Sequence, residues 1–387
     1  MRAANHSQKV ILISFMIAGS VTLTLGIRYI KAQDQNGQQE TEYVQTNLVS
    51  NGYVKAMIMD THVVNPWGMT ASATSPFWVA NQGTNTSTLY TVNNINNGIG
   101  SPFTVMIPTV GSLPPQGPTG LVFNSTPTAF LIPSGTLGGS PVPSRFIFAN
   151  LNGTISGWNP ASTGGRTESV IAVSTAGAVY TGLALGTVGS NIDLYAADFV
   201  ANGGGIRIFD SSFNPAGNLV SHPFEDPQLP PAPPGTAWEP YNIANVNGHL
   251  MVAYDPLSLT THLPAPGEHH GVIAEFTTSG AFIRNFAMEG QLSDPWGMAL
   301  ATDHFGRFSG DLLVGNFGNG RILAYTMDGH FRGFLRGPDH KPLENGFLWT
   351  LWFGNGANGA DPNTLFITTG GQDEMKDGLI AAIKAAQ

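Results

Sequence analysis

Short apolar segments separated by polar, glycine-rich turns recur along the chain from about residue 43 onward. Near residue 66 the sequence reads NPWGMTASATSPFWVANQGTNTSTLY, and near residue 295 it reads DPWGMALATDHFGRFSGDLLVGNFGNGRILAY. Both copies have a PWGM opening, a loop, an apolar stretch that ends in Ala-Asn or Gly-Asn, a turn, and a further stretch that ends in an aromatic residue. Apolar runs this short, bounded by such turns, predict β-strands rather than helices.

Weaker copies of the same motif occupy the rest of the chain. They open at PTGLVFN (118–124), YTGLALG (180–186), PYNIANV (240–246) and LWTLWFGN (348–355). The six openings are 52 to 62 residues apart, which matches propeller blades of about 40–50 residues with insertions. A small sheet cannot bury both faces alone, so such blades stack in a ring. The sequence therefore predicts an all-β protein, a six-bladed β-propeller of four-stranded antiparallel blades, as a single domain over residues 43–384.

Glycine recurs at one position of the motif, two residues after the opening of four copies. These glycines are Gly68, Gly120, Gly182 and Gly297. Glycine inside a strand pattern marks a place where another backbone approaches closely. We therefore expect the four residues on the innermost strand of each blade, next to the central channel.

The N-terminus has a different pattern, a continuous apolar run over residues 10–27 with basic residues on both sides. This pattern predicts an export signal that ends near Ala32. The run is also close to the length of about 18 residues at which an uncleaved membrane anchor becomes the alternative. Residues 1–32 are thus expected to be a signal peptide or anchor and residues 33–42 a polar linker. The remainder is expected to be secreted or periplasmic, or else anchored facing outside the cytoplasm.

Several long strings together resemble one family. They include NPWGM with FWVANQGT, NGTISGWNP and GDLLVGNFGNGRI. In these strings the chain resembles a family of uncharacterised exported bacterial proteins that are predicted to be six-bladed β-propellers, distantly similar to NHL-type repeats. The resemblance implies the fold but no activity. Thr350 stands where the family usually has glycine, which predicts looser packing of the last inner strand.

Composition and charge exclude several classes of chemistry. The 387 residues include no cysteine, which removes disulfides, thiolate metal sites and cysteine nucleophiles. The net charge of −9 has the wrong sign for binding a phosphate backbone, so no nucleic-acid partner is expected. No G-x-S-x-G, H-E-x-x-H or P-loop string occurs. The string GNGANG at 354–359 leads into a predicted strand, whereas dinucleotide binding needs a helix there.

Amides and acids stand at equivalent strand ends in five copies of the motif: Asn81, Asn150, Asp198, Asp255 and Asn316. In a ring of blades, some of these side chains could converge at the channel mouth and bind Ca²⁺, which prefers six to eight oxygen ligands. Alternatively, each side chain caps the turn after its own strand by accepting backbone N–H bonds. We favour the second interpretation, because the turns that follow are rich in Gly and Asn. No resident cofactor is expected on that interpretation.

Three tryptophans, Trp67, Trp296 and Trp349, recur beside the predicted inner strand. Trp67 and Trp296 are candidates for an aromatic surface that stacks on a ligand. The alternative, which we favour, is that the tryptophans are structural and wedge between blades. His269 and His270, close to Glu268 and His262, are weak candidates for a Zn²⁺ or Cu²⁺ site.

Two functions fit these observations. The first, which we favour, is a monomeric binding protein that recognises a protein, a glycan or a small molecule through its loops. The second is a divalent-cation-assisted hydrolase of the lactonase or esterase type that uses the central channel. The fold alone cannot decide between them, because one fold hosts many functions.

Export is expected to depend on the apolar run. The double substitution Ile13→Asp with Ile17→Asp should keep the protein in the cytoplasm, because each acid costs about 2.5–3.5 kcal/mol at the centre of a membrane-inserted helix. Cell fractionation measures the effect, and mass spectrometry of the exported protein should show an N-terminus near Gln33. An intact Met1 on membrane-bound protein would instead support the anchor.

Overall fold

The computed structural model describes residues 41–386, apart from 112–114, 202, 217–219, 266, 268, 289 and 374–375. The predicted signal or anchor segment and most of the predicted linker therefore lie outside the described residues. Within the described part of the chain, no helix is long and apolar enough to cross a membrane.

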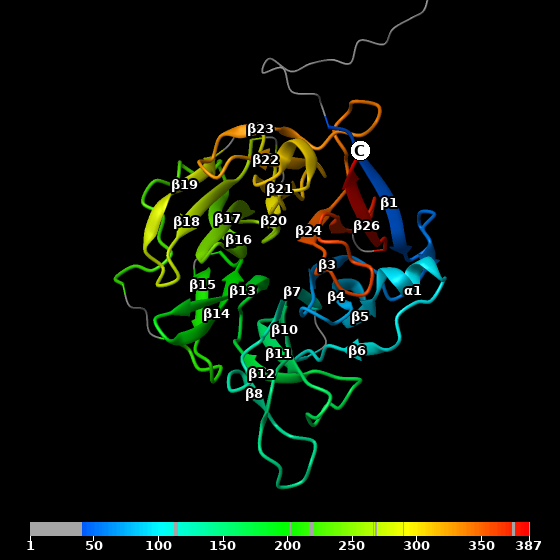
Figure 1. Ribbon diagram of the computed structural model, residues 1–387. Helices are drawn as coiled ribbons and strands as arrows, with labels where there is room; N and C mark the ends of the chain where they lie inside the picture. Colours follow the sequence, from blue (N-terminus) through cyan, green and yellow to red (C-terminus); the bar gives the residue numbers. More distant parts are fainter. Residues whose placement is uncertain are drawn as a thin grey trace, which may run out of the picture. The chain divides into compact units, whose positions relative to one another are not determined.

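The described chain is nearly all β-structure, and its sheets are arranged as blades around a common axis (Figure 1). Blade 1 consists of β3 (Pro66–Thr70), β4 (Phe77–Asn81), β5 (Thr86–Tyr90) and β6 (Thr104–Met106). Blade 2 consists of β7 (Pro118–Phe123), β10 (Phe146–Asn150), β11 (Thr154–Trp158) and β12 (Val170–Ser174). In each blade successive strands pair antiparallel, from the inside of the ring outward.

The next two blades carry the longest strands of the described chain. Blade 3 consists of β13 (Tyr180–Val188), β14 (Asn191–Asp198) and β15 (Gly205–Phe209), three strands within the described residues. Blade 4 consists of β16 (Thr236–Val246), β17 (His249–Ser258), β18 (Val272–Phe276) and β19 (Phe282–Met288). The prediction of four strands per blade is thus matched in blade 4, whereas blade 3 has one strand fewer among the described residues.

Blades 5 and 6 complete the ring, and blade 6 closes it by pairing the two ends of the described chain. Blade 5 consists of β20 (Pro295–Leu300), β21 (Leu312–Asn316), β22 (Ile322–Tyr325) and β23 (Phe331–Phe334). Blade 6 consists of β24 (Leu348–Phe353), β25 (Leu365–Thr369), β26 (Leu379–Ala385), β1 (Tyr43–Ser50) and β2 (Ile58–Met59). Strand β1 runs antiparallel to β26 from Tyr43 opposite Ala385 to Ser50 opposite Leu379. The six-bladed β-propeller expected from the repeats is confirmed.

Several short elements lie in the connections between strands. They are the hairpin of β8 (Leu131–Ile132) and β9 (Val142–Pro143), helix α1 (Val92–Asn96), and the 3₁₀ turns η1 (Gln82–Thr84) and η2 (Gly306–Phe308). The hydrophobic core lies between neighbouring blades, as where Leu313 of blade 5 and Ile367 of blade 6 share one cluster of buried side chains. Burial of both faces of each sheet explains why the strands are so apolar.

The four repeated glycines lie on inner strands, as expected: Gly68 on β3, Gly120 on β7, Gly182 on β13 and Gly297 on β20. A Cβ atom on Gly68 would lie 2.5 Å from the carbonyl oxygen of Thr119 in the next blade. A Cβ atom on Gly297 would overlap the carbonyl oxygen of Trp349. The inner strands therefore approach one another too closely for a side chain at these positions.

The other two blades use a polar side chain at the same position. The Asn242 Nδ2 group of blade 4 donates a hydrogen bond to the Trp296 carbonyl oxygen of blade 5 at 2.6 Å. The Thr350 hydroxyl of blade 6 donates to the Trp67 carbonyl oxygen of blade 1 at 2.7 Å. The expectation that Thr350 loosens the last inner strand is wrong, because its hydroxyl bonds directly to the next blade.

Substitution of Gly297 tests this packing. Gly297→Val should lower the free energy of unfolding by about 1–3 kcal/mol or more, because the side chain overlaps backbone that cannot move aside. Gly100→Val is the matched control, since no heavy atom lies within 4 Å of the added Cβ position there. Urea unfolding measures the stability of both variants. Equal stability of the two would contradict the placement of Gly297 on an inner strand packed against the next blade.

Candidate functional site

A central cavity of about 270 Å³ is bounded by the inner strands of all six blades. It is lined by Gly68, Met69, Thr70, Gly120, Leu121, Val122, Leu183, Ala184, Leu185, Asn242, Ile243, Ala244, Asn245, Trp296, Gly297, Met298, Thr350 and Leu351. None of these lining residues is ionisable. Each inner strand is the end strand of its sheet. One edge of its backbone N–H and C=O groups is therefore left without a neighbouring strand and faces the axis.

An aromatic cluster of Trp67, Tyr241, Trp296, Phe317 and Trp349 lies where the inner strands begin. The rings of Trp67 and Trp349 stack with centroids 3.5 Å apart. Trp296 packs edge-on against both, at 5.9 and 5.7 Å. The tryptophans are buried, as the packing interpretation expects, but they contact one another instead of wedging separately between blades. Because each occupies the same position of its blade, the ring symmetry brings them together.

Hydrogen bonds fix two of these indoles. Trp349 Nε1 donates to Asn65 Oδ1 at 2.8 Å, and Trp296 Nε1 donates to the Thr181 carbonyl oxygen at 3.1 Å. Trp296 is also among the residues that border the cavity, whereas Trp67 is not. Of the two tryptophans that were candidates for ligand contact, the structure therefore places only Trp296 beside the cavity.

The five candidate amides and acids occupy equivalent register positions, each opposite or next to the start of its inner strand. All five side chains are buried, with exposed fractions of 0–1%. The sixth member of this ring is Thr369, which lies opposite Leu348 in blade 6. Thr369 was not among the candidates from the sequence, although LFITTG, like FWVAN, ends just before a turn that contains glycine.

Two members of the ring accept backbone N–H groups, but only Asn150 accepts one from the turn after its own strand, as the capping interpretation expects. Asn150 Oδ1 accepts hydrogen bonds from the Gly117 N–H at 3.0 Å and the Asn152 N–H at 3.1 Å. Asp198 Oδ1 accepts from the Val179 N–H at 2.8 Å, and its Oδ2 pairs with Arg207 Nε at 2.9 Å. These side chains hold the segment that leads into the inner strand of the same blade.

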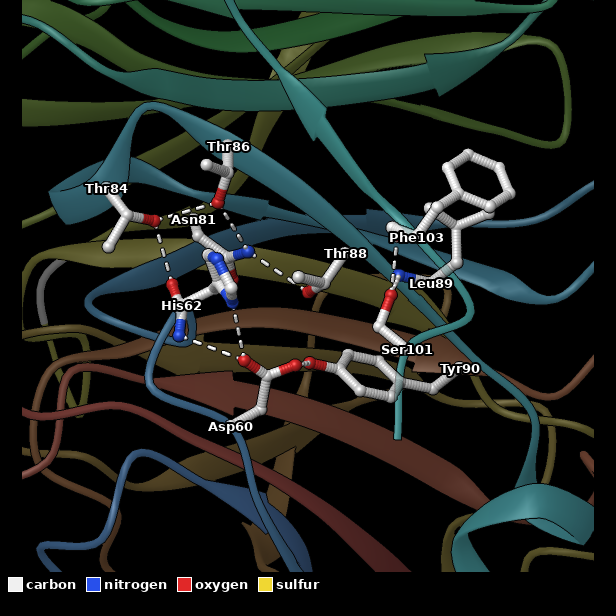
Figure 2. A network of polar contacts seen from close by, with 10 residues as sticks. All are labelled: Asp60, His62, Asn81, Thr84, Thr86, Thr88, Leu89, Tyr90, Ser101 and Phe103. Atoms are coloured by element: carbon white, nitrogen blue, oxygen red, sulfur yellow. Dashed lines mark hydrogen bonds and ion pairs between the residues drawn. The ribbon is translucent and has the colours of Figure 1, made fainter. Parts of the chain in front are cut away.

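Two other members act as donors, so the capping interpretation is wrong for them. Asn81 Nδ2 donates to the hydroxyls of Thr86 and Thr88 at 3.2 and 3.0 Å (Figure 2). Asn316 Nδ2 donates to the Gln291 carbonyl oxygen at 2.9 Å. The threonines on β5 and the Gln291 carbonyl oxygen are acceptors, so each amide presents its NH₂ group to them.

Asp255 differs from the other members, because its partner is a second carboxyl group. The Asp294 carboxyl group lies beside it, and both side chains are fully buried. Burial, together with the neighbouring Asp294, raises the pKa of Asp255 well above its usual range. Burial also raises the pKa of Asp294. The prediction that Asp255 ends its strand and caps the turn after it is wrong, because β17 continues to Ser258 and neither Asp255 carboxyl oxygen accepts a backbone N–H of the described residues.

The adjacent histidines bond to separate main-chain carbonyl groups. His269 Nδ1 contacts the Gly290 carbonyl oxygen, and His270 Nδ1 lies 3.0 Å from the Ala265 carbonyl oxygen. Glu268 lies outside the described residues. Among the residues that the structure does describe, no three acidic or histidine side chains gather in a way that could hold a metal ion.

A second polar network, in and beside blade 1, was not anticipated from the sequence (Figure 2). Asp60 Oδ1 bonds to the His62 backbone N–H at 3.0 Å and to its ring Nδ1 at 2.9 Å, and Asp60 Oδ2 accepts from the Tyr90 hydroxyl at 2.8 Å. Burial raises the pKa of Tyr90 well above its usual range, so the phenol stays protonated and donates. The Thr84 hydroxyl donates to the His62 carbonyl oxygen at 2.8 Å. These bonds tie the segment before β3 to its blade.

The fold and the buried polar ring define a six-bladed β-propeller whose central cavity has one aromatic end. The chain belongs to the family of the uncharacterized protein R648 of Acanthamoeba polyphaga mimivirus, with 32% identity over 87% of this chain and 78% of that protein. The uncharacterized protein L690 of the same virus is 29% identical over 87% of this chain and 84% of its own length. No family model matches the sequence. The relatives are viral, so the expected membership of an exported bacterial family is not confirmed.

Among solved structures, the PQQ-bound aldose sugar dehydrogenase of Streptomyces coelicolor is similar in fold. It has a TM-score of 0.50 and 14% sequence identity, and the match covers 89% of this chain and 99% of that chain. At this level of identity the similarity concerns the propeller fold alone.

The ion pair of Asp198 gives a direct prediction. Asp198→Asn should lower the free energy of unfolding by about 0.5–2 kcal/mol, because the buried carboxylate loses its charge-assisted hydrogen bond to the partly exposed Arg207. Asp303→Asn, at an exposed aspartate, is the control and should leave stability unchanged. Urea denaturation at neutral pH measures both, and an unchanged Asp198→Asn variant would show that the pair contributes nothing.

Proposed function

We propose that this propeller is a binding protein that holds a small, uncharged ligand in its central cavity. The observation that carries the proposal is the lining of the cavity, which six inner strands provide without an ionisable side chain. A charged ligand would lose its hydration there without gaining an ion partner, which costs several kcal/mol. The site therefore favours neutral molecules.

The backbone edges indicate the chemical class of the ligand. Six inner strands turn one edge, which pairs with no further strand, toward the axis, while Leu121, Leu183 and Met298 supply apolar surface beside it. A polyhydroxylated ring suits this surface, because its hydroxyls both donate and accept and its C–H faces are apolar. The cavity of about 270 Å³ is slightly smaller than the range of about 300–1,000 Å³ of drug-sized pockets, so the ligand is expected to be about one sugar ring in size.

The hydrolase alternative draws less support from the same residues. Asn150 and Asp198 are engaged with backbone N–H groups and an arginine, and Asp255 is engaged with Asp294. None of them lines the cavity. A cation that polarises a substrate carbonyl would need several of these oxygens free and directed to one point. Binding without turnover fits the arrangement better.

A matched set of sugars tests the proposal. D-glucose should raise the melting temperature of the protein, because a ligand that binds only the folded state stabilises it by mass action. Its charged analogues, D-glucuronate and D-glucosamine, should give no shift. Thr70→Arg places a large cation in the cavity and should abolish the effect of glucose, as measured by thermal shift and calorimetry.

The control is Thr260→Arg, at an exposed threonine outside the cavity lining, which should bind glucose as the unchanged protein does. Equal binding by the Thr70→Arg and Thr260→Arg variants would place the ligand elsewhere. A metal-dependent turnover of an ester or lactone by the purified protein would instead support the hydrolase.

A further inference from the structure

We propose that Asp255 and Asp294 share one proton and form a pH-sensitive latch between blades 4 and 5. Asp255 lies on β17 of blade 4, and Asp294 lies directly before β20 of blade 5. The inference stands on this buried pair alone and does not depend on the ligand proposed above.

The contacts of the two carboxyl groups support a shared proton. Three of the four carboxyl oxygens accept no hydrogen bond from an N–H or O–H group of the described residues. They are both oxygens of Asp255 and the Oδ1 of Asp294. Asp294 has two further neighbours, the Gly267 N–H and the Ser293 hydroxyl, the latter 3.5 Å from its Oδ2. Two carboxyl groups within hydrogen-bonding distance in a dry site cannot both ionise at low cost, so one keeps its proton.

The ionisable groups around the pair include one histidine and further acids. The His270 side chain acts on Asp294, and its carbonyl oxygen accepts the Asp294 N–H at 2.9 Å. Glu239 on β16 is the register partner of Asp255, so the element packed beside β17 adds a further acid. In blade 3, the Asp198 carboxylate is already paired with Arg207. A proton held between Asp255 and Asp294 therefore removes one of the two negative charges that the pair would otherwise place between blades 4 and 5.

The sign of the pH effect follows from the raised pKa of both groups. The folded protein binds a proton that the unfolded chain releases at lower pH. The pair therefore contributes stability that is complete in acid and is lost as the pH rises through the folded-state pKa. Above that pH the two carboxylates repel each other, and the link between β17 and the start of β20 weakens. Trp296, which borders the cavity, follows Asp294 by two residues, so this change occurs next to the aromatic end of the cavity.

Urea unfolding of the full chain at a series of pH values tests the latch. In the unchanged protein the free energy of unfolding should fall as the pH is raised from about 5 to about 9. In Asp255→Asn an amide can donate to an ionised Asp294, so this fall should be smaller, and the unfolding constant at the alkaline end should be at least about tenfold lower than in the unchanged protein. Asp303→Asn, at an exposed aspartate, should keep the unchanged profile.

Infrared spectroscopy gives a second measurement, whose deciding result comes from the unchanged protein. The unchanged protein at neutral pH should show the C=O band of a protonated carboxyl group, shifted in D₂O, and a folded Asp255→Asn variant should lack it. Absence of the band in the unchanged protein would overturn the proposal. So would a stoichiometric divalent cation whose removal by EDTA lowers the melting temperature, because the pair would then bind a metal instead of a proton.

Discussion

The close approach of inner strands around one axis is the constraint on which the rest of this structure depends. In four blades glycine at the inner strand allows this close approach. In the other two, Asn242 or Thr350 stands there, and its side chain bonds to a carbonyl oxygen of the next blade. Both solutions fix the spacing between neighbouring blades. That spacing in turn brings Trp67, Trp296 and Trp349 together and leaves a small cavity bounded by strand edges.

Burial of the strand ends imposes a second requirement, since a buried polar group without a partner costs about 1–3 kcal/mol. The ring of amides and acids meets it with different partners in each blade. Asn150 and Asp198 accept backbone N–H groups, whereas Asn81 donates to threonine hydroxyls. Asp255 accepts no such group of the described residues; it lies beside Asp294, and burial raises its pKa well above the usual range.

The buried polar residues that stabilise the ring are different from the residues that line the candidate binding site. Of the two acids in the ring, Asp198 bonds to Arg207 and to backbone, and Asp255 lies beside Asp294; neither lines the cavity. The cavity keeps strand edges and aliphatic side chains instead. This division is consistent with recognition of a neutral ligand by shape and hydrogen bonding, because the groups that would be needed for acid–base chemistry are occupied elsewhere.

The sequence by itself determined the number of blades, the single ring and the place of the inner glycines, because strand patterns and turns are local and repeat along the chain. The repeats also place the three tryptophans at one position of the motif and Asp255 at another. Only the tertiary structure decided what those positions contact. Stacking of blades 4 and 5 brings Asp294 to Asp255, and closure of the ring brings Trp67 to Trp349 and Thr350 to the first blade. Contacts between blades depend on that closure, which no local pattern encodes.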